Sequence, residues 1–143
     1  MRFFRQLPLL AVWGLCTTAQ DAPVPPTMTL LYSMACDLGE RFTIGNVPNG
    51  KARYVIPIIG GTFKGPRVSG KILNVGADWL LVDAQGKARP DTRYNLQTDD
   101  GAIIYVRTEG PTLKDGRILL SGKFETDTNG TYGWMNDVVA ANP

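Results

Sequence analysis

Carboxyl groups are the side chains of this chain best suited to proton transfer, because its 143 residues include no histidine. Without histidine, the chain cannot build a Ser-His-Asp or Cys-His catalytic site, or the usual His-ligated zinc site. A carboxylic acid in an apolar pocket has a raised pKa and can then deliver a proton near neutral pH. Asp78 and Glu125 are the candidates for such an acid or base, ahead of Asp91 and Asp99.

Each of these carboxyl groups also has a structural interpretation. Asp78 stands before a tryptophan that opens an apolar run, where an aspartate can stabilise a turn. Glu125 lies two residues from a lysine and can pair with a cation across strands. Asp99 and Asp100 precede a glycine, as turn residues do. The acidic residues show no full set of oxygen ligands for calcium, so no metal site is expected.

Arginine and aromatic side chains could bind a substrate beside such a carboxyl group. Arg53 and Arg93 can hold a negative enolate or phenolate oxygen, and each can equally form a structural ion pair. Trp79 and Trp134 can stack on an aromatic substrate or pack in the core. Arg93 joins the catalytic candidates, and the candidates for substrate binding are Arg53, Trp79, Tyr94, Tyr105, Tyr132, Trp134 and Asn136.

The composition narrows the class of partner. Fifteen Lys and Arg against thirteen Asp and Glu leave a net charge of +2 without a basic run, so nucleic acid is not an expected partner. Hydrophobic residues make up 43% of the chain, as in ordinary globular proteins. Cys36 is expected to be a small buried apolar residue rather than a catalytic thiol.

The N-terminus has the features of a cleavable secretion signal. A basic start is followed by a short apolar run and by the small residues Thr17, Thr18 and Ala19. The alternative is a buried first strand or helix; the run is too short for a stable membrane span. We expect a secreted protein, or one in the lumen of the secretory pathway, with a signal over 1–19, a Pro-rich leader over 20–27 and a domain over 28–143.

Turn signals divide the rest of the chain into short segments. Asn-Gly and Asp-Gly pairs and similar turns recur, with runs rich in Val, Ile, Thr and aromatic residues between them. No segment after residue 27 has a convincing helical period. The pattern predicts an all-β fold, a single up-and-down antiparallel β-barrel like those of lipocalins and other calycins. In a secreted chain, the triplet that starts at Asn129 is an N-glycosylation acceptor.

Strand parity groups several of the candidates. If residues 117–126 and 131–136 pair across the turn at Asn129, one face is apolar and includes Phe124 and Met135. The other face is either exposed to solvent or the inner wall of a ligand pocket, and spacing alone does not choose. It carries Ser121, Lys123, Glu125, Tyr132, Trp134 and Asn136.

The neighbouring hairpin allows two registers. A three-residue loop at residues 99–101 places Arg93, Asn95 and Gln97 on the same side as Ile103, Tyr105 and Arg107. A two-residue loop would invert this correspondence.

Four ordered blocks of sequence resemble domain-of-unknown-function family 3237. They are IIGGTFKG at 58–65, GADW at 76–79, RYNLQTDDG at 93–101 and FET at 124–126, the last followed by YGWMN at 132–136. Together they extend over almost the whole chain after the leader. Members usually continue into another strand after the last block, so we expect an incompletely closed barrel or an edge covered by a second subunit.

The resemblance implies a compact β-barrel, often a homo-oligomer. Some fungal members are linked to cofactor-free ring closure in natural-product pathways, including the addition of a hydroxyl across an alkene. For this chain it implies a cofactor-independent cyclase or isomerase of a phenolic or polyketide-type compound, with the Glu125 face turned inward. The alternative is a non-catalytic carrier of a hydrophobic aromatic molecule. A buried Asp78 or Glu125 with a raised pKa would favour the enzyme, and a purely apolar lining would favour the carrier.

Overall fold

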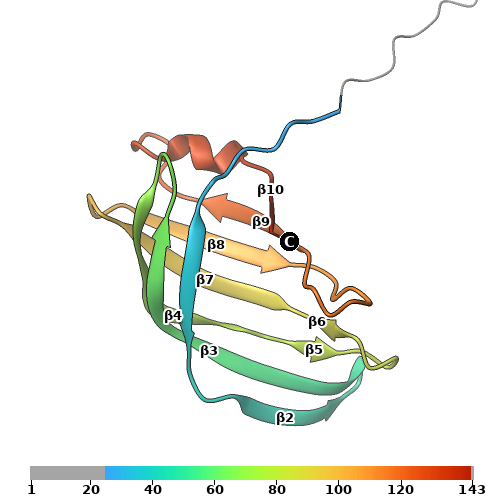
Figure 1. Ribbon diagram of the computed structural model, residues 1–143. Helices are drawn as coiled ribbons and strands as arrows, with labels where there is room; N and C mark the ends of the chain where they lie inside the picture. Colours follow the sequence, from blue (N-terminus) through green and yellow to red (C-terminus); the bar gives the residue numbers. More distant parts are fainter. Residues whose placement is uncertain (1–24, 143) are drawn as a thin grey trace, which may run out of the picture.

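The computed structural model describes residues 25–142, and its regular elements are antiparallel β-strands and one short 3-10 helix (Figure 1). The predicted signal over residues 1–19 lies outside this part of the chain. The elements are β1 (Ser33–Leu38), β2 (Phe42–Val47), β3 (Gly50–Lys64), β4 (Ser69–Asp78), β5 (Leu81–Val82), β6 (Ala88–Arg89), β7 (Asp91–Thr98), β8 (Ile103–Glu109), β9 (Leu120–Glu125), the 3-10 helix η1 (Gly133–Asp137) and β10 (Ala140–Asn142). The predicted all-β class is confirmed.

The long strand β3 organises the sheet. Its C-terminal half pairs with β1 on one side and β4 on the other, and its N-terminal half pairs with β2 and β5. From β4 the sheet continues through β7, β8 and β9 to β10 and curls into a barrel-like shape (Figure 1). Among the described residues no pairing joins β1 to β10, so the barrel is open along this seam.

The interior next to η1 is a tightly packed apolar core. Leu96, Ile104, Val106 and Met135 are completely buried, and Phe124 is 5% exposed. Along β7, β8 and β9 the buried residues alternate with more exposed ones, as expected for strands with one face on a core. Burying one such side chain contributes roughly 1.5–3 kcal/mol. The remaining residues of this core are Ile58, Phe63, Val68, Ile72 and Tyr94.

The hairpin of β7 and β8 has the register of a three-residue loop. Gln97 pairs with Ile103, and Arg93 pairs with Arg107. The first of the two predicted registers is therefore confirmed. It places Tyr94 and Leu96 inside and the arginines outside.

The predicted hairpin between residues 117–126 and 131–136 is wrong. After β9 the chain turns at Asp127, whose carboxylate accepts the backbone N–H of Asn129 at 2.9 Å, and it then enters η1 instead of a strand. Gly133 permits this path, since a Cβ there would lie 2.3 Å from the carbonyl oxygen of Thr128. η1 is a short 3-10 helix of five residues, and residues 25–142 contain no α-helix, as the absence of a convincing helical period after residue 27 predicts.

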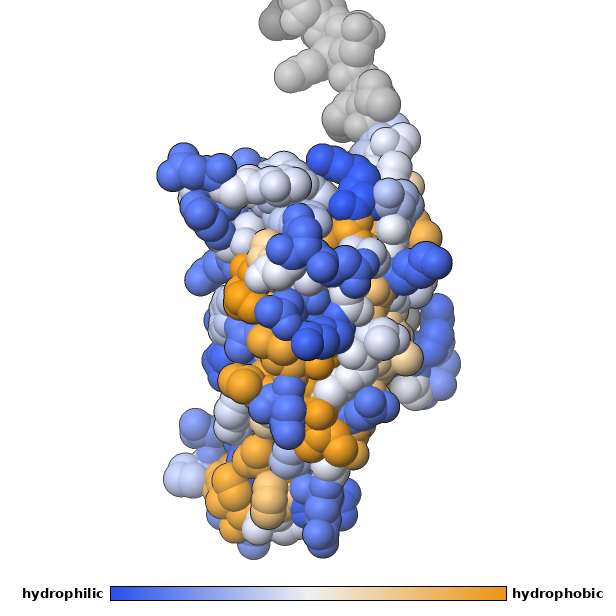
Figure 2. Space-filling view, turned by 90° about the vertical axis from the view of Figure 1, so that its left-hand side faces the viewer, coloured by the Kyte–Doolittle hydropathy of each residue, from blue (hydrophilic) through white to orange (hydrophobic). Residues whose placement is uncertain are grey.

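On the face shown in Figure 2, apolar patches lie between polar and charged side chains. Ile59 on β3 and Val75 on β4 are among the exposed apolar residues. Between residues 25 and 142, no helix has the length and apolar character needed to span a membrane.

Candidate functional site

A row of residues crosses the inner face of the barrel just beyond the core. Thr92 lies two residues from the buried Tyr94, and Ile56 lies two residues from the buried Ile58, so the row faces inward. Each member is the register partner of the next: Ile56, Asp78, Thr92, Thr108, Gly122 and Ala140. We call the end of the barrel beyond this row, beside β5 and β6, the open end, and the end around η1 the closed end (Figure 1).

The row marks the boundary between the core and solvent. Its side chains are half-buried, whereas those of the next row toward η1 are buried. A Cβ added at Gly122 would lie 3.4 Å from the Ala140 Cβ and 3.8 Å from the Thr108 Cγ2, which shows that the row is continuous across β8, β9 and β10. It therefore forms a mixed polar and apolar floor for the open end.

Asp78 is the one charged residue in this row. Its Oδ1 accepts the backbone N–H of Asp91 at 3.0 Å, and its side chain also hydrogen-bonds to Thr92. Burial raises the pKa of Asp78; these hydrogen bonds and the attraction of Arg53 oppose that rise without cancelling it. A half-buried carboxyl group with a raised pKa is suited to hold a proton and release it during a reaction.

Gly76 fixes the position of Asp78 on β4. Its φ is +136°, and a Cβ there would lie 2.2 Å from the carbonyl oxygen of Arg93. Only glycine allows β4 and β7 to approach this closely. The contact brings Asp78 within hydrogen-bonding distance of the first residues of β7.

Arg53 supports the segment that follows Asp78. Its Nη1 donates a hydrogen bond to the carbonyl oxygen of Trp79 at 2.5 Å, and its charge acts on Asp78. The two candidates are thus close together. One donor of Arg53 is committed to the backbone, and its charge lowers the cost of ionising Asp78.

Arg93 and Trp79 belong to the outer face of the barrel. Arg93 pairs with Asp91 at 3.1 Å, and its guanidinium lies 5.5 Å from the centre of the Trp79 ring. Arg107 also contacts Asp91, at 3.3 Å, and contacts Glu109 at 2.9 Å. The structure therefore places Arg93 in a surface ion-pair network, away from the inward row of Asp78.

Glu125 is exposed and lies on the outer face too. It is the register partner of Tyr105, and its neighbour Phe124 is the residue that enters the core. The expectation that the Glu125 face turns inward is wrong, because the inner positions of β9 belong to the apolar set of Gly122 and Phe124. The geometry leaves Asp78 as the inward carboxyl group of the two main candidates.

Tyr94 is part of the core, where it is 4% exposed. Its hydroxyl donates to the Sδ of Met34 at 3.5 Å, and it hydrogen-bonds to Tyr32. Burial raises its pKa strongly, so it stays protonated. Tyr94 thus shapes the inner wall beneath the row without reaching the open end.

The other predicted residues of the C-terminal segment lie at the closed end. Tyr132 and Trp134 pack against the core. Asn136 holds η1 to β9, because its side chain accepts the N–H of Thr126 at 2.8 Å and donates to the Thr126 carbonyl at 3.1 Å. The predicted pocket of Glu125, Tyr132, Trp134 and Asn136 is therefore not one surface.

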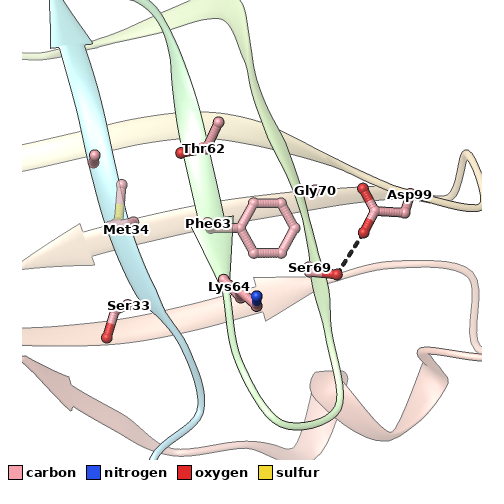
Figure 3. Close-up of a pocket in the computed structure, with 9 residues that line it drawn as sticks. Ser33, Met34, Thr62, Phe63, Lys64, Ser69, Gly70 and Asp99 are labelled. Atoms are coloured by element: carbon pink, nitrogen blue, oxygen red, sulfur yellow. Dashed lines mark hydrogen bonds between the residues drawn. The ribbon is translucent and has the colours of Figure 1, made fainter.

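Two shallow depressions lie on the outer face, beside the turn between β7 and β8. Figure 3 shows the one lined by residues of β1, β3 and β4 together with Asp99. The carboxylate in both depressions is that of Asp99, which accepts a hydrogen bond from the Ser69 hydroxyl at 2.5 Å. Its backbone N–H donates to the Ser69 carbonyl at 3.1 Å. This supports the structural interpretation of Asp99, which ties the turn to β4.

Two further candidates from the sequence can be placed. Cys36 is half-buried on β1 beside the core, and burial raises the pKa of its thiol, which disfavours the reactive thiolate. Asn129 is exposed in the turn between β9 and η1. Over residues 25–142 no three or more Cys, Asp or Glu side chains gather as metal ligands would.

Residue types alone did not reveal Tyr54, Thr92 or Thr108 as parts of the open end. Tyr54 lies on β3 two residues before Ile56, and therefore on the same inward face. The threonines face inward because they alternate with charged residues of the outer network along β7 and β8. Such an alternation is visible in the sequence, but it needs the strand register to join it to Asp78.

Related proteins share this architecture. A β-barrel-like protein of Acinetobacter baumannii has a solved structure with a TM-score of 0.67 and 32% identity, over 85% of this chain and 88% of that one. An enzyme of Penicillium herquei gives a TM-score of 0.72 at 25% identity, over 85% and 86% of the two chains. The barrel-like fold is therefore that of solved relatives.

Sequence similarity points to the same group. The hydroalkoxylation enzyme phnH of Penicillium herquei is 29% identical over 96% of this chain and 86% of its own length. A UPF0311 protein of Rhodopseudomonas palustris is 34% identical over 59% of this chain. The matched segment covers 56% of that relative's length. The model of the family described as "Protein of unknown function (DUF3237)" matches residues 26–141, and the chain belongs to this family.

Proposed function

We propose that this chain is a cofactor-independent cyclase that closes an oxygen-containing ring on a phenolic or polyketide-type compound, with Asp78 as its proton donor and acceptor. The observation that carries the proposal is the half-buried Asp78, with its raised pKa, in the inward row of the open end. The similarity to a hydroalkoxylation enzyme over 96% of the chain supports the reaction class.

Ring closure by hydroalkoxylation needs one proton to be moved and no oxidant or reductant. The Asp78 carboxyl gives its proton to one alkene carbon while the substrate hydroxyl oxygen bonds to the other. The hydroxyl proton then returns to the Asp78 carboxylate. One C–O bond and one C–H bond thus replace the O–H bond and the π bond, and the product is an isomer of the substrate.

The residues around Asp78 fit these steps. The hydrogen bonds from the Asp91 N–H and Thr92 hold the carboxyl group in place, and the charge of Arg53 stabilises it after the proton has left. Ile56 on the neighbouring strand gives an apolar contact for a hydrocarbon skeleton. Holding the substrate hydroxyl and alkene together at this place would itself lower the activation free energy of ring closure by several kcal/mol, because the entropy cost of bringing the two groups together is met on binding.

The test compares wild type, Asp78→Asn and Glu125→Gln on phenols that carry an ortho-allyl group, because protonation of the terminal alkene carbon and C–O bond formation at the internal one create a stereocentre. Loss of a true general acid should lower kcat by about 100-fold or more. Glu125→Gln is the matched control, since it also replaces a carboxylate by its amide but on the exposed outer face. Rate and product enantiomeric excess should be scored together. If all three proteins give racemic product at the background rate, the cyclase proposal fails.

The second candidate is a carrier of a hydrophobic aromatic molecule. It is favoured by the uncharged character of the other inward residues, Ile56, Thr92 and Thr108. A carrier would bind the same phenols in wild type and in Asp78→Asn and convert them in neither.

A further inference from the structure

Tyr54 extends the floor of the open end beyond Asp78. Its backbone N–H donates to the Leu80 carbonyl at 2.9 Å. Tyr54 therefore lies opposite Leu80, in the same register in which Ile56 pairs with Asp78. Tyr54 and Asp78 are therefore diagonal neighbours on one face, with main chains about 7–8 Å apart. The two side chains therefore project from the same face of the sheet, beyond the core.

Arg41 lies on the ring of Tyr54. Its guanidinium carbon is 4.5 Å from the ring centre, in a cation–π arrangement, and the residue is exposed at the start of β2. Within the described part of the chain Arg41 makes no ion pair and no side-chain hydrogen bond, although Asp37 and Glu40 are close in sequence. Its guanidinium donors are therefore available to a ligand.

The other arginines of the barrel are used differently. Arg89, Arg93, Arg107 and Arg117 each pair with an aspartate. Arg67 also stacks on an aromatic ring, that of Trp134 at 3.7 Å, but at the closed end where the core fills the interior. Arg93 lies over the Trp79 ring as well, but on the outer face. Of the three stacked arginines, Arg41 is the one whose aromatic partner, Tyr54, faces inward beyond the row.

We propose that Arg41, held in place by the Tyr54 ring, is an anion-binding subsite of the open end and selects aromatic ligands that carry a carboxylate or phenolate. The planar guanidinium recognises a carboxylate through two parallel hydrogen bonds. The ligand ring then lies between Tyr54 and Asp78. This proposal rests on the assignment of the reaction to Asp78 and adds the class of substrate that the site takes.

Binding of 1-naphthoate and 1-naphthamide tests the proposal, because the two differ in charge and hardly in shape. Calorimetric titration of wild type should show a preference for naphthoate of roughly fivefold, the upper range for an exposed charge pair. Arg41→Gln should abolish this preference and leave naphthamide binding unchanged. Arg67→Gln is the matched control and should keep the preference. A preference that survives in Arg41→Gln, or is absent from wild type, overturns the proposal.

Further variants locate the subsite and separate it from catalysis. Tyr54→Phe keeps the ring and should keep the preference, whereas Tyr54→Leu should weaken it. Asp78→Asn should increase the preference, because naphthoate binds more tightly once a nearby negative charge is removed and naphthamide does not; naphthoate binding that does not tighten would place the ligand away from Asp78 and overturn the subsite. If Arg41→Gln loses the preference while Asp78→Asn leaves ring closure unchanged, the subsite stands and the catalytic assignment of Asp78 fails.

Discussion

The two ends of the barrel are built from the same strands but filled in different ways. At the closed end the core residues and the completely buried Met135 of η1 leave no accessible interior. At the open end the inward row is half-buried and includes a carboxyl group. The difference indicates that apolar packing at one end provides the stability that lets the other end keep a desolvated carboxyl group.

Two aspartates of the open end sharpen this comparison. In the turn after β5, Asp83 accepts the backbone N–H groups of Gln85 and Lys87 and pairs with Arg89 at 2.9 Å, and these donors lower its pKa. Asp78 has fewer donors and is penalised by burial, so its pKa is raised. Asp83 is thus stabilised in its charged form by the fold, whereas Asp78 is held at a cost that a chemical role would explain.

The largest effect on stability is expected at the closed end. Met135→Ala removes a completely buried side chain and should lower the free energy of unfolding by about 2–5 kcal/mol. Ile56→Ala at the half-buried row should cost less, because the site is already partly hydrated. Urea denaturation with an unchanged m-value checks both. Equal losses would show that the two ends do not differ in packing.

Much of the fold followed from local patterns in the sequence. The turn at residues 99–101 and the alternation on either side of it predicted the β7–β8 hairpin and left two registers open, of which the structure has the one with a three-residue loop. Turn residues and strand periods are local properties, so they can be read without knowing the fold. The family resemblance, carried by four blocks, was confirmed by the match over residues 26–141.

The C-terminal segment departs from the predicted alternation because two periods compete there. A strand-like alternation is suggested by Tyr132, Trp134 and Asn136. In the structure the core is contacted by Tyr132, Met135 and Val138, which are three residues apart, and also by Trp134. A spacing of three is the period of a 3-10 helix. The Asx turn at Asp127 was the local sign of this outcome.

The surroundings of Asp78 depend on contacts between distant segments. Its neighbours Ile56 and Thr92 come from other strands, and its backbone donor is Asp91. Residue types could nominate Asp78, Glu125, Arg53 and Arg93 alike. Only the register across β3, β4 and β7 separates the inward Asp78 from the outward Glu125 and Arg93.

An intermediate effect is expected from the pH dependence of the two aspartates. The lowered pKa of Asp83 stabilises the fold above the unfolded value near 3.9, and this contribution disappears as pH falls through the folded pKa. Asp83→Asn should therefore lower Tm at pH 7 and approach wild type in acid.

Asp78→Asn should show the opposite sign. Because the pKa of Asp78 is raised, its ionised form destabilises the fold at neutral pH, and this penalty is relieved as pH falls toward the unfolded value near 3.9. The variant should match or exceed the wild-type Tm at pH 7 and lose that advantage in acid. Thermal unfolding between pH 3 and 7 checks both variants. A Tm at pH 7 that is lower for Asp78→Asn than for Asp83→Asn would contradict the contrast.

The smallest effect is expected from Arg67 and Arg41, two of the arginines that stack on aromatic rings. Arg67 joins the loop between β3 and β4 to Trp134 of η1, so Arg67→Gln should lower the free energy of unfolding by about 0.5–1 kcal/mol, the value for an exposed cation–π pair. Arg41 stacks on Tyr54 at the longer distance of 4.5 Å and joins no element to the core, so Arg41→Gln should cost less. Hydrogen exchange of the η1 amides gives a second measurement, because loss of the Arg67 contact should speed exchange there and loss of the Arg41 contact should not. If Arg41→Gln were the more destabilising change, Arg41 would be a structural clamp of the open end rather than a group free to bind a ligand.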